Sequence, residues 1–594
     1  MAEFKAPLRD MRFVLTELFD FNDINQLPGC EDFTPDVVDA VLEEAAKVCQ
    51  EVLYPINRSG DEEGCTWNDG VVTTPKGFKE AYQTFAEGGW TGIACDPAYG
   101  GQGAPKTLNA LVEEMICSTN LSFGMYPGLS YGAYAALHSH ASNELKDRYL
   151  PQMVAGTWSG TMCLTEPHCG TDLGIIRSKA EPRDDGSYAI SGTKIFISAG
   201  EHDLTENIIH LVLAKLPNAP KGTKGISLFV VPKFMIKDDG TLGDRNSVKC
   251  GSIEHKMGIK ASSTCVMNFD NAVGWLVGEP HQGMPAMFTM MNQERLSVGI
   301  QGLGLGEAAY QGAAAYARDR LQGRALTGPK SPNKEADSLL VHPDVRRMLL
   351  TQRAYNEGSR AMGIWVARAL DTMKHHENAQ TREEADEFVQ LMTPIVKALF
   401  TDWGFETANI GMQVFGGHGY IREWGMEQYV RDARIAQIYE GTNGIQALDL
   451  VGRKMGAKAG RYLRRFFHPV QEYIEAHVSD EGLGDFVQPL AKAFMRLQQA
   501  TAEIAQRGMK NPDEAGAAAT DYLRLFGLVA VGFMWARMAE ISLQKQDEDS
   551  DGFYKAKLIT ARFYMERILP QSGALFSAIM AGSKTMMAMD EDAF

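Results

Sequence analysis

The chain reads Gln437-Ile438-Tyr439-Glu440-Gly441-Thr442-Asn443-Gly444-Ile445-Gln446 just after a basic, helix-like stretch. This segment places a carboxylate, Glu440, beside a glycine, whose backbone adopts conformations that other residues avoid. Two upstream segments give it weight: Gly416-Gly417-His418-Gly419-Tyr420, and Cys163-Leu164-Thr165-Glu166-Pro167-His168-Cys169-Gly170-Thr171-Asp172. A lone glutamate beside a glycine would indicate little, so the three segments have to be interpreted together.

The length and charge of the chain limit the classes of protein to which it can belong. At 594 residues it is too long for one hydrophobic core, so several domains are expected. Its 58 Lys and Arg residues against 75 Asp and Glu residues give a net charge of −17. Such a chain is repelled by nucleic acid and by anionic membranes, so no nucleic-acid partner is predicted. A ligand that carries phosphate would need a local basic patch.

Cysteine usage and the apolar runs predict a cytoplasmic protein without a membrane span. Nine cysteines lie at irregular spacing between Cys30 and Cys265, and an odd number in a long chain is no disulfide framework. Cys163 and Cys169 lack the spacing and histidine partners of a zinc site, so no metal is predicted. The first ten residues carry charge where a signal peptide needs an apolar core. The longest apolar run, 525–536, is too short to cross a bilayer and is interpreted as a buried helix.

Periodicity predicts a mostly α-helical fold with a central β domain. Apolar residues recur at helical spacing from residue 34 to about 158, as in Val37, Val38, Val41 and Leu42. Short β-branched or aromatic runs follow at 188–192, 195–198, 208–213 and 226–231, which is typical of a small barrel or sandwich. Helical spacing returns at residue 284, with a loop at 326–333 and later breaks near 479–485, at 511–512 and at 547–551. The predicted domains are 1–160 (N-terminal arm and helices), 161–283 (β domain), 284–455 (helices) and 456–594 (additional helices).

The segment Gly302-Leu303-Gly304-Leu305-Gly306 looks like half of a dinucleotide-binding fingerprint. That motif requires a preceding strand and a surrounding βαβ unit, whereas residues 299–317 are mostly small and apolar without strand character. We therefore expect these glycines to allow close helix packing.

The three segments, together with the order of the domains, resemble the acyl-CoA dehydrogenase family over residues of about 75 to 455. Leu164-Thr165-Glu166-Pro167 with Gly170-Thr171-Asp172 is similar to the family's first flavin signature, and Gly192-Thr193-Lys194-Ile195-Phe196-Ile197-Ser198 to its second. Phe196 stands where the family usually has tryptophan and Ser198 where it has threonine, which keeps an aromatic face and a hydroxyl. The resemblance implies a helical domain, a β-barrel and a four-helix domain, FAD as cofactor, and an oxidoreductase that acts on a CH–CH bond.

The resemblance also implies which residues hold the flavin. Arg320 matches the family's arginine that reaches the flavin pyrophosphate of a neighbouring subunit, so a homodimer or homotetramer is expected, with Arg324 as the alternative arginine. His168 and His418 are expected to make structural hydrogen bonds. The implied cofactor set is Met162, Leu164, Thr165, Gly170, Thr171, Phe196, Ile197, Ser198, Arg320, Gln413, Gly416, Gly417 and Thr442.

The implied substrate contacts and the catalytic base follow from the same likeness. Arg295 matches the arginine that contacts coenzyme A, and the other implied substrate contacts are Thr171, Asn292 and Gly441. Dehydrogenation needs a base for the α proton of the thioester while the β hydride leaves for the flavin, and Glu440 is the expected base. The family's alternative base position falls on Glu294, so both glutamates stay candidates, with Glu440 favoured because its Ile-Tyr-Glu-Gly-Thr segment is intact.

The region beyond residue 455 is similar to long members of the family and bears on the substrate. Lys5-Ala6-Pro7-Leu8-Arg9-Asp10 and His342-Pro343-Asp344-Val345-Arg346-Arg347 resemble the subgroup that oxidises 3-(methylthio)propanoyl-CoA to 3-(methylthio)acryloyl-CoA, within dimethylsulfoniopropionate catabolism. An electron-transfer flavoprotein is the expected electron acceptor. Three alternatives stay open: a medium- or long-chain fatty acyl-CoA dehydrogenase of β-oxidation, an acyl-CoA oxidase, and a DNA-associated alkylation-response homologue. The 16 basic and 18 acidic residues over 455–594 argue against the last of these.

Overall fold

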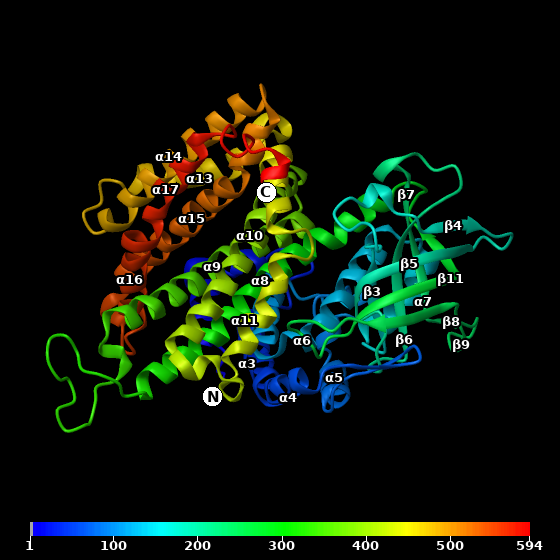
Figure 1. Ribbon diagram of the computed structural model, residues 1–594, viewed down its shortest axis with the longest axis horizontal. Coiled ribbons are helices and arrows are strands. Elements are labelled where there is room, and N and C mark those ends of the chain that lie inside the picture. Colours follow the sequence, from blue (N-terminus) through cyan, green and yellow to red (C-terminus); the bar gives the residue numbers. More distant parts are fainter. Residues whose placement is uncertain (1–3) are drawn as a thin grey trace. The chain divides into compact units, whose positions relative to one another are not determined.

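The computed structural model describes residues 4–594, apart from the side chains of residues 290–294. The chain divides into two compact units, and each is described by itself. The helical unit comprises the described part of Met1–Glu44 together with Lys106–Ser118 and Val298–Phe594. The sheet unit comprises Ala45–Pro105 and Thr119–Ser297. The prediction of a mostly α-helical chain with a central β domain is confirmed (Figure 1).

The sheet unit is built around a closed β-barrel. Its strand order is β10-β11-β5-β4-β6-β3, and β7 pairs with both β11 and β6, so the path from β11 through β5, β4, β6 and β7 returns to β11. Pairing is antiparallel except for the parallel contacts that β6 makes with β3 and β4. The predicted runs of β-branched residues fall in these strands, and their inward side chains, such as Ile190, Val212 and Phe229, form the core. The barrel strands are β3 (Trp158–Cys163), β4 (Lys179–Pro182), β5 (Tyr188–Ser198), β6 (Asn207–Lys215), β7 (Ile226–Pro232), β10 (Val248–Ile253) and β11 (Thr264–Val277).

Two short hairpins in the sheet unit lie outside the barrel. β1 (Thr66–Asn68) pairs with β2 (Val71–Thr73) inside the region that periodicity assigned to helices, so that assignment was wrong there. The reason is local: Asp69 (φ +43) and Gly70 (φ +89) form a two-residue turn of the kind that closes hairpins, and strands of three residues are too short to show a period. The second hairpin joins β8 (Phe234–Ile236) to β9 (Leu242–Arg245).

The helices of the sheet unit include part of a long helix that both units share. α6 (Lys106–His140) is interrupted at Asn120, whose φ of −161° is not helical, and the boundary between the units falls one residue earlier. The Asn120 side chain accepts a hydrogen bond from the Phe123 N–H at 3.0 Å, which caps the second segment of the helix. The other helices that lie wholly in this unit are α4 (Asn57–Glu63), α5 (Phe78–Glu87) and α7 (Asn143–Val154).

The helical unit contains long helices that pack through small residues. Gly302, Gly304 and Gly306 lie in the interior of α8 (Gly283–Asp319), and a Cβ on any of them would collide with a neighbouring helix; at Gly304 it would lie 2.9 Å from the Glu114 carbonyl oxygen. The expectation of close helix packing is therefore confirmed. The breaks expected in the later helices also occur where α13, α14, α15 and α16 end or begin. The described α-helices that lie wholly or partly in this unit are α1 (Leu8–Arg12), α2 (Asn22–Asn25), α3 (Pro35–Val48, shared), α6 (shared), α8 (shared), α9 (Pro343–His375), α10 (Ala379–Val414), α11 (Met426–Arg434), α12 (Asn443–Asp449), α13 (Arg461–His477), α14 (Gly484–Gly508), α15 (Pro512–Gln544), α16 (Phe553–Phe563) and α17 (Ser572–Ala581).

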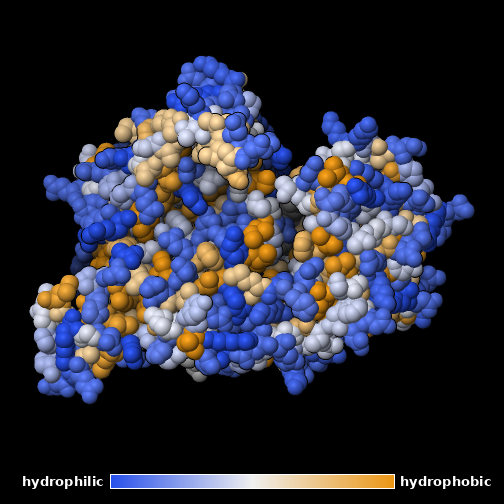
Figure 2. All heavy atoms as spheres, viewed as in Figure 1, coloured by the Kyte–Doolittle hydropathy of each residue, from blue (hydrophilic) through white to orange (hydrophobic). Residues whose placement is uncertain are grey.

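Among the described residues, one helix, α15, has the length and apolar composition that a membrane span would need. It is largely enclosed, because 83% of its most apolar window is buried inside the protein. The buried run expected at 525–536 lies in this helix and includes Leu525, Phe526 and Trp535. Figure 2 shows hydrophilic residues over much of the visible face, with apolar residues among them, as is usual for protein surfaces.

A buried charge cluster joins the N-terminal segment to helices far along the chain. Arg360 is 1% exposed and forms ion pairs with Asp10, with Glu114 at 2.5 Å and with Glu307 at 3.0 Å. Lys557 pairs with Asp10 and, at 2.7 Å, with Glu357, which also pairs with Arg353 at 2.5 Å. The charge cluster thus comprises three cations and four carboxylates: Arg353, Arg360, Lys557, Asp10, Glu114, Glu307 and Glu357. Desolvation raises the pKa of Glu114 to about 7, with a further rise from the nearby Glu307 and Asp10 carboxylates, although Arg360 opposes it.

Candidate functional site

The first flavin segment forms a tight loop between β3 and β4 in the sheet unit. Its turn is closed by two backbone hydrogen bonds between Glu166 and Cys169, of 2.9 and 3.0 Å. The Thr165 carbonyl accepts a third bond, of 2.9 Å, from the Ile195 N–H, which ties the loop to β5. Met162, Leu164 and Thr165 are half-buried, whereas Gly170 and Thr171 are exposed. The glycine end of the loop is therefore exposed at the surface, while the start of the loop is fixed to the barrel.

Glu166 fixes the shape of this loop and was not recognised from the sequence. Its carboxylate accepts hydrogen bonds from the Arg177 and Ser178 N–H groups, at 2.7 and 3.0 Å, and from the Ser178 hydroxyl at 2.7 Å. The fully buried Lys194 donates to Glu166 at 2.9 Å and to the Leu164 carbonyl at 3.0 Å. Burial raises the pKa of Glu166, but Lys194 and the backbone donors outweigh it and hold the pKa below its usual range. Lys194 lies inside the second flavin segment, so the two segments are joined by a buried ion pair.

Glu166, His168 and Cys169 place three potential metal ligands within 4.8 Å of one another. The Glu166 oxygens already accept the bonds described above, and the His168 Nε2 atom lies 2.9 Å from the Ile175 carbonyl oxygen. These contacts show that Glu166 and His168 support the loop. His168 therefore makes the structural hydrogen bond expected of it.

The second flavin segment presents an aromatic ring from a strained position. Phe196 has a φ of +58° and is 59% exposed, although it lies within β5, near the C-terminal end of the strand. The strand bulges there, because the register with β11 shifts between Cys265 and Met267. A left-handed conformation costs a non-glycine residue about 1–2 kcal/mol, so this ring is held outward at a cost. Ile197 is buried in the barrel core and Ser198 is half-buried.

Arg320 and Arg324, the two candidates for the flavin pyrophosphate, differ in what they contact. Arg324 donates to the carbonyls of Ser331, Lys334 and Glu335 at 2.6–3.0 Å and pairs with Asp337 at 3.4 Å. Its guanidinium therefore shapes the loop predicted at 326–333. Burial raises the pKa of Asp337, but bonds from the Lys330, Ala325 and Ser331 N–H groups bring it to about 2. Arg320 is exposed, and its side chain has no hydrogen-bond or ion-pair partner among the described side chains.

The glycine segment after α10 is open on one side. A Cβ on Gly416 or Gly417 would meet nothing within 4 Å, and Gly416 also has a φ of +59°. Neighbouring packing therefore does not require glycine at these two positions, which leaves room for a ligand to approach the backbone. Gln413, which precedes them, is exposed. His418 lies beneath, with its Nδ1 atom 2.7 Å from the Tyr316 hydroxyl and its ring stacked on Trp424 at 4.6 Å, so it has the structural role expected of it.

Glu440 lies in a left-handed turn in the helical unit. Its φ is +56° and that of Gly441 is +85°, so two consecutive residues adopt the conformation that only glycine tolerates freely. The Gln446 side chain donates to the carbonyls of both residues, at 3.3 and 3.2 Å. Thr442 caps α12 by accepting a bond of 3.3 Å from the Ile445 N–H. The turn is thus stabilised from its C-terminal side, with Glu440 half-buried.

The predicted substrate residues near position 295 are only partly described. The backbone of Asn292 and Glu294 is helical, within α8, but their side chains lie outside the described residues. Arg295 is 8% exposed.

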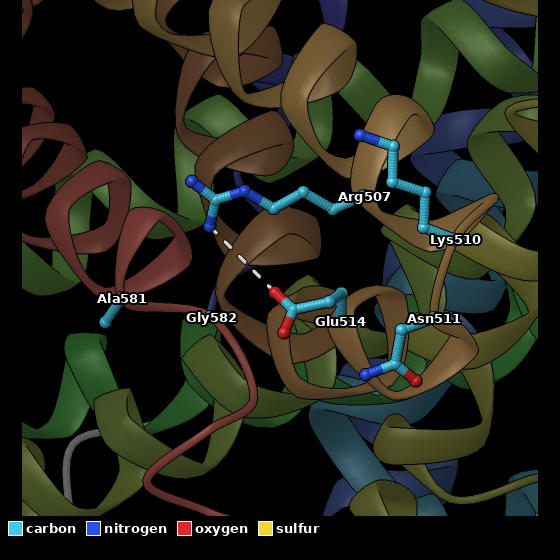
Figure 3. A pocket seen from close by; sticks show the side chains of 6 residues that line it. All are labelled: Arg507, Lys510, Asn511, Glu514, Ala581 and Gly582. Carbon is cyan, nitrogen blue, oxygen red and sulfur yellow. Dashed lines mark ion pairs between the residues drawn. The ribbon is translucent and has the colours of Figure 1, made fainter.

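A shallow hollow of about 330 Å³ lies among the C-terminal helices, lined by Arg507, Lys510, Asn511, Glu514, Ala581 and Gly582 (Figure 3). Two of its charged groups have partners: Arg507 pairs with Glu503 at 2.6 Å and with Glu514 at 3.9 Å, and Glu514 accepts from the Ser583 N–H at 3.2 Å. None of the predicted site residues lines it.

Comparison with known proteins identifies the family. Models of the N-terminal, middle and C-terminal domains of acyl-CoA dehydrogenase match residues 36–157, 161–272 and 281–455, and a model described as acetyl-CoA dehydrogenase C-terminal like matches residues 466–590. The chain is 41% identical to 3-methylmercaptopropionyl-CoA dehydrogenase of Ruegeria pomeroyi over 97% of its own length and 98% of the relative. The chain belongs to the acyl-CoA dehydrogenase family. The resemblance that the flavin segments suggested is thereby confirmed.

Two further relatives of this acyl-CoA dehydrogenase show the range of the family. A butyryl-CoA dehydrogenase of Syntrophomonas wolfei is 35% identical over 99% of this chain and 98% of that protein. The solved structure of an acyl-CoA dehydrogenase of Bacillus anthracis complexed with FAD covers 99% of this chain and 93% of that chain, with a TM-score of 0.72 at 21% identity. The additional C-terminal helices are therefore part of a shared fold.

As a member of this family the protein is an FAD-dependent oxidoreductase that dehydrogenates an acyl-CoA at a CH–CH bond. The residues present fit that cofactor. The sheet unit offers an exposed aromatic ring at Phe196 and a glycine-ended loop at Gly170, and the helical unit offers an unpaired cation at Arg320, among the described side chains, and open glycines at Gly416 and Gly417.

Proposed function

We propose that this acyl-CoA dehydrogenase converts 3-(methylthio)propanoyl-CoA to 3-(methylthio)acryloyl-CoA. The observation that carries the proposal is the 41% identity, over almost the whole of both chains, to an enzyme named for that substrate. The butyryl-CoA dehydrogenase relative supports a short acyl group as well, because a 3-(methylthio)propanoyl chain has the length of a pentanoyl chain. The two named substrates share a short acyl chain, so the proposed pocket is one that accepts a short acyl group.

Glu440 is the proposed base for the α proton. Its support is conformational: a glutamate stays in a left-handed turn only when its surroundings enforce it, and such positions gather at functional sites. Gly441, Thr442 and Gln446 provide that enforcement. Gly441 is also a proposed substrate contact, because the family resemblance places it at the turn where a thioester oxygen would need a donor.

FAD supplies the acceptor for the β hydrogen, which leaves as hydride. In the sheet unit, Thr165, Gly170 and Thr171 are proposed to bind the flavin ring through the loop that Glu166 fixes. Phe196 and Ser198 are proposed to give it an aromatic face and a hydroxyl, with Met162, Leu164 and the backbone of Ile197 beside them. In the helical unit, Arg320 is proposed to bind the pyrophosphate of FAD. The rest of FAD is proposed to contact Gln413, Gly416, Gly417 and Thr442. Arg295, Asn292 and Thr171 are the proposed contacts to the substrate and its coenzyme A portion.

The proposal extends to partners and compartment. We propose an electron-transfer flavoprotein as the electron acceptor and a homodimer or homotetramer as the working form. The cytoplasm is the proposed compartment, which the nine free thiols support, since long-lived free cysteines are typical of reducing surroundings.

A substrate panel tests the reaction. With dye as acceptor, kcat/KM for 3-(methylthio)propanoyl-CoA should exceed that for octanoyl- and palmitoyl-CoA by about tenfold or more, since each surplus methylene costs about 1–3 kcal/mol in a closed pocket. A preference for palmitoyl-CoA would reject the substrate.

Two variants test the base. Glu440→Gln should lower kcat by about 10²- to 10⁴-fold, while Glu294→Gln stays near the wild-type value. The reverse pattern would transfer the role to Glu294.

A further inference from the structure

We infer that Lys397 is a positioning residue that holds the Glu440 turn in its catalytic conformation, an inference that rests on the proposed role of Glu440. Lys397 lies in the middle of α10 and is fully buried. Its ammonium donates to the Gly441 carbonyl at 2.9 Å and to the Asn443 Oδ1 atom at 2.9 Å. Burying a lysine in a helical core costs folding free energy unless its ammonium group is hydrogen-bonded or paired.

The first contact acts on the strained part of the turn. Gly441 follows Glu440, and both have positive φ angles, so the peptide between them is turned away from the path that an ordinary loop would take. The hydrogen bond from Lys397 fixes the carbonyl at the end of that pair, and a bond from a charged donor is about twice as strong as a neutral one. The Gln446 amide adds a neutral donor to the same carbonyl at 3.2 Å. Lys397 is therefore the charged donor that fixes the Gly441–Thr442 peptide, one residue beyond the base.

The second contact fixes where the turn leads. Asn443, the first residue of α12, accepts from Lys397 and donates to the Asp402 carboxylate at 2.7 Å and to the Ala398 carbonyl at 3.2 Å. Asp402 also accepts from the Gln437 side chain at 2.7 Å, on the other side of the turn. Asn443 and Gln437 are three residues from Glu440 on either side. One helix, α10, thus holds both ends of the turn and, through Lys397, its centre.

This arrangement predicts a specific kinetic effect. Lys397 acts through the backbone next to Glu440, so its loss should displace the carboxylate without removing any group that binds the flavin. A displacement on the order of 1 Å at a reacting group lowers the rate by roughly 10²-fold. Lys397→Met should therefore lower kcat by about 10- to 100-fold and change KM by less than about threefold, with normal FAD content.

The decisive experiment is a double-mutant cycle with Glu440, on the FAD-loaded full chain. If Lys397 works through Glu440, adding Lys397→Met to Glu440→Gln should lower the residual kcat by less than about twofold, since the group that it positions is already gone. Equal losses in both backgrounds would show a general structural role and overturn the inference. Lys454→Met is the matched control. Lys454 donates to Gln390, which lies in α10 as Lys397 does, at 2.7 Å, and the Lys454→Met variant should leave kcat unchanged.

A second variant covers the case in which Lys397→Met fails to fold. Asn443→Ala removes one partner of Lys397 and one tether of α12 without emptying the core, and it should lower kcat with the same dependence on Glu440. Wild-type kcat in Asn443→Ala would contradict the inference. If instead Glu440→Gln itself keeps near-normal turnover, the assignment of the base fails, and that failure is seen in the single variant alone.

Discussion

Glu114 in the buried charge cluster is predicted to make stability depend on pH. Among the described members of this cluster, three cations face four carboxylates, so one carboxylate is in surplus. Desolvation raises the pKa of Glu114 from 4.5 to about 7, so Glu114 is the carboxylate of this cluster that keeps a proton. Between these two values the folded protein binds a proton that the unfolded chain releases. Its contribution to stability is therefore present below pH 4.5 and is lost as the pH rises through 7.

The magnitude follows from the shift. About 2.5 pKa units at about 1.4 kcal/mol each amount to about 3 kcal/mol, which wild-type protein loses between pH 4.5 and pH 8. Glu114→Gln removes the titration and leaves Arg360 paired with Asp10 and Glu307. The variant should therefore gain up to about 3 kcal/mol over wild type at pH 8, near 6 °C in Tm at roughly 2 °C per kcal/mol, and less than about 1 kcal/mol at pH 5.

Thermal unfolding of the FAD-loaded wild type and variant at pH 5 and pH 8 measures this difference. Comparing the two proteins at each pH cancels the titrating groups that do not interact with Glu114. A variant less stable than wild type by about 3 kcal/mol or more at both values would refute the reasoning, because it would show that Glu114 is ionised and needed by Arg360.

Three further predictions concern the flavin. Arg320→Met should weaken FAD binding by about 10- to 100-fold, the loss of a charge-assisted bond, whereas Arg324→Met should lower Tm and leave FAD affinity of the folded protein near normal; equal FAD affinity in both, measured by fluorescence titration, would reject the assignment. Phe196→Gly should raise the unfolding free energy of the apoprotein by roughly 1 kcal/mol by relieving the positive φ, yet weaken FAD binding in calorimetry; a destabilised apoprotein would contradict the strain. Turnover should need an electron-transfer flavoprotein or a dye, and comparable rates with oxygen alone would indicate an oxidase.

The elements that the sequence predicted well are those whose signal is local. The predicted runs at 188–192, 195–198, 208–213 and 226–231 are rich in β-branched residues, and the first two form a single strand, β5. The loop at 326–333 is marked by Gly328, Pro329 and Pro332. The flavin and base segments could be proposed from the sequence for the same reason, since each is a short contiguous motif. The β1–β2 hairpin was missed although Asp69-Gly70 signals it, because three-residue strands carry no period.

The supports of the site could not be predicted, because they pair residues far apart in the chain. Lys194 meets Glu166 across 28 positions, and Lys397 meets the Gly441 carbonyl across 44. A lysine in an apolar helix gives no sign of its partner until the helix and the turn are placed together. The same holds for Arg360 and Asp10, which are 350 positions apart.

Anaerobic titration of the enzyme with 3-(methylthio)propanoyl-CoA tests the central claim most directly. The account predicts that the visible absorbance of the bound FAD bleaches with about one equivalent of substrate, and that mass spectrometry finds the acyl product two hydrogen atoms lighter, as 3-(methylthio)acryloyl-CoA. Unchanged absorbance with this thioester, together with full bleaching by palmitoyl-CoA, would contradict it.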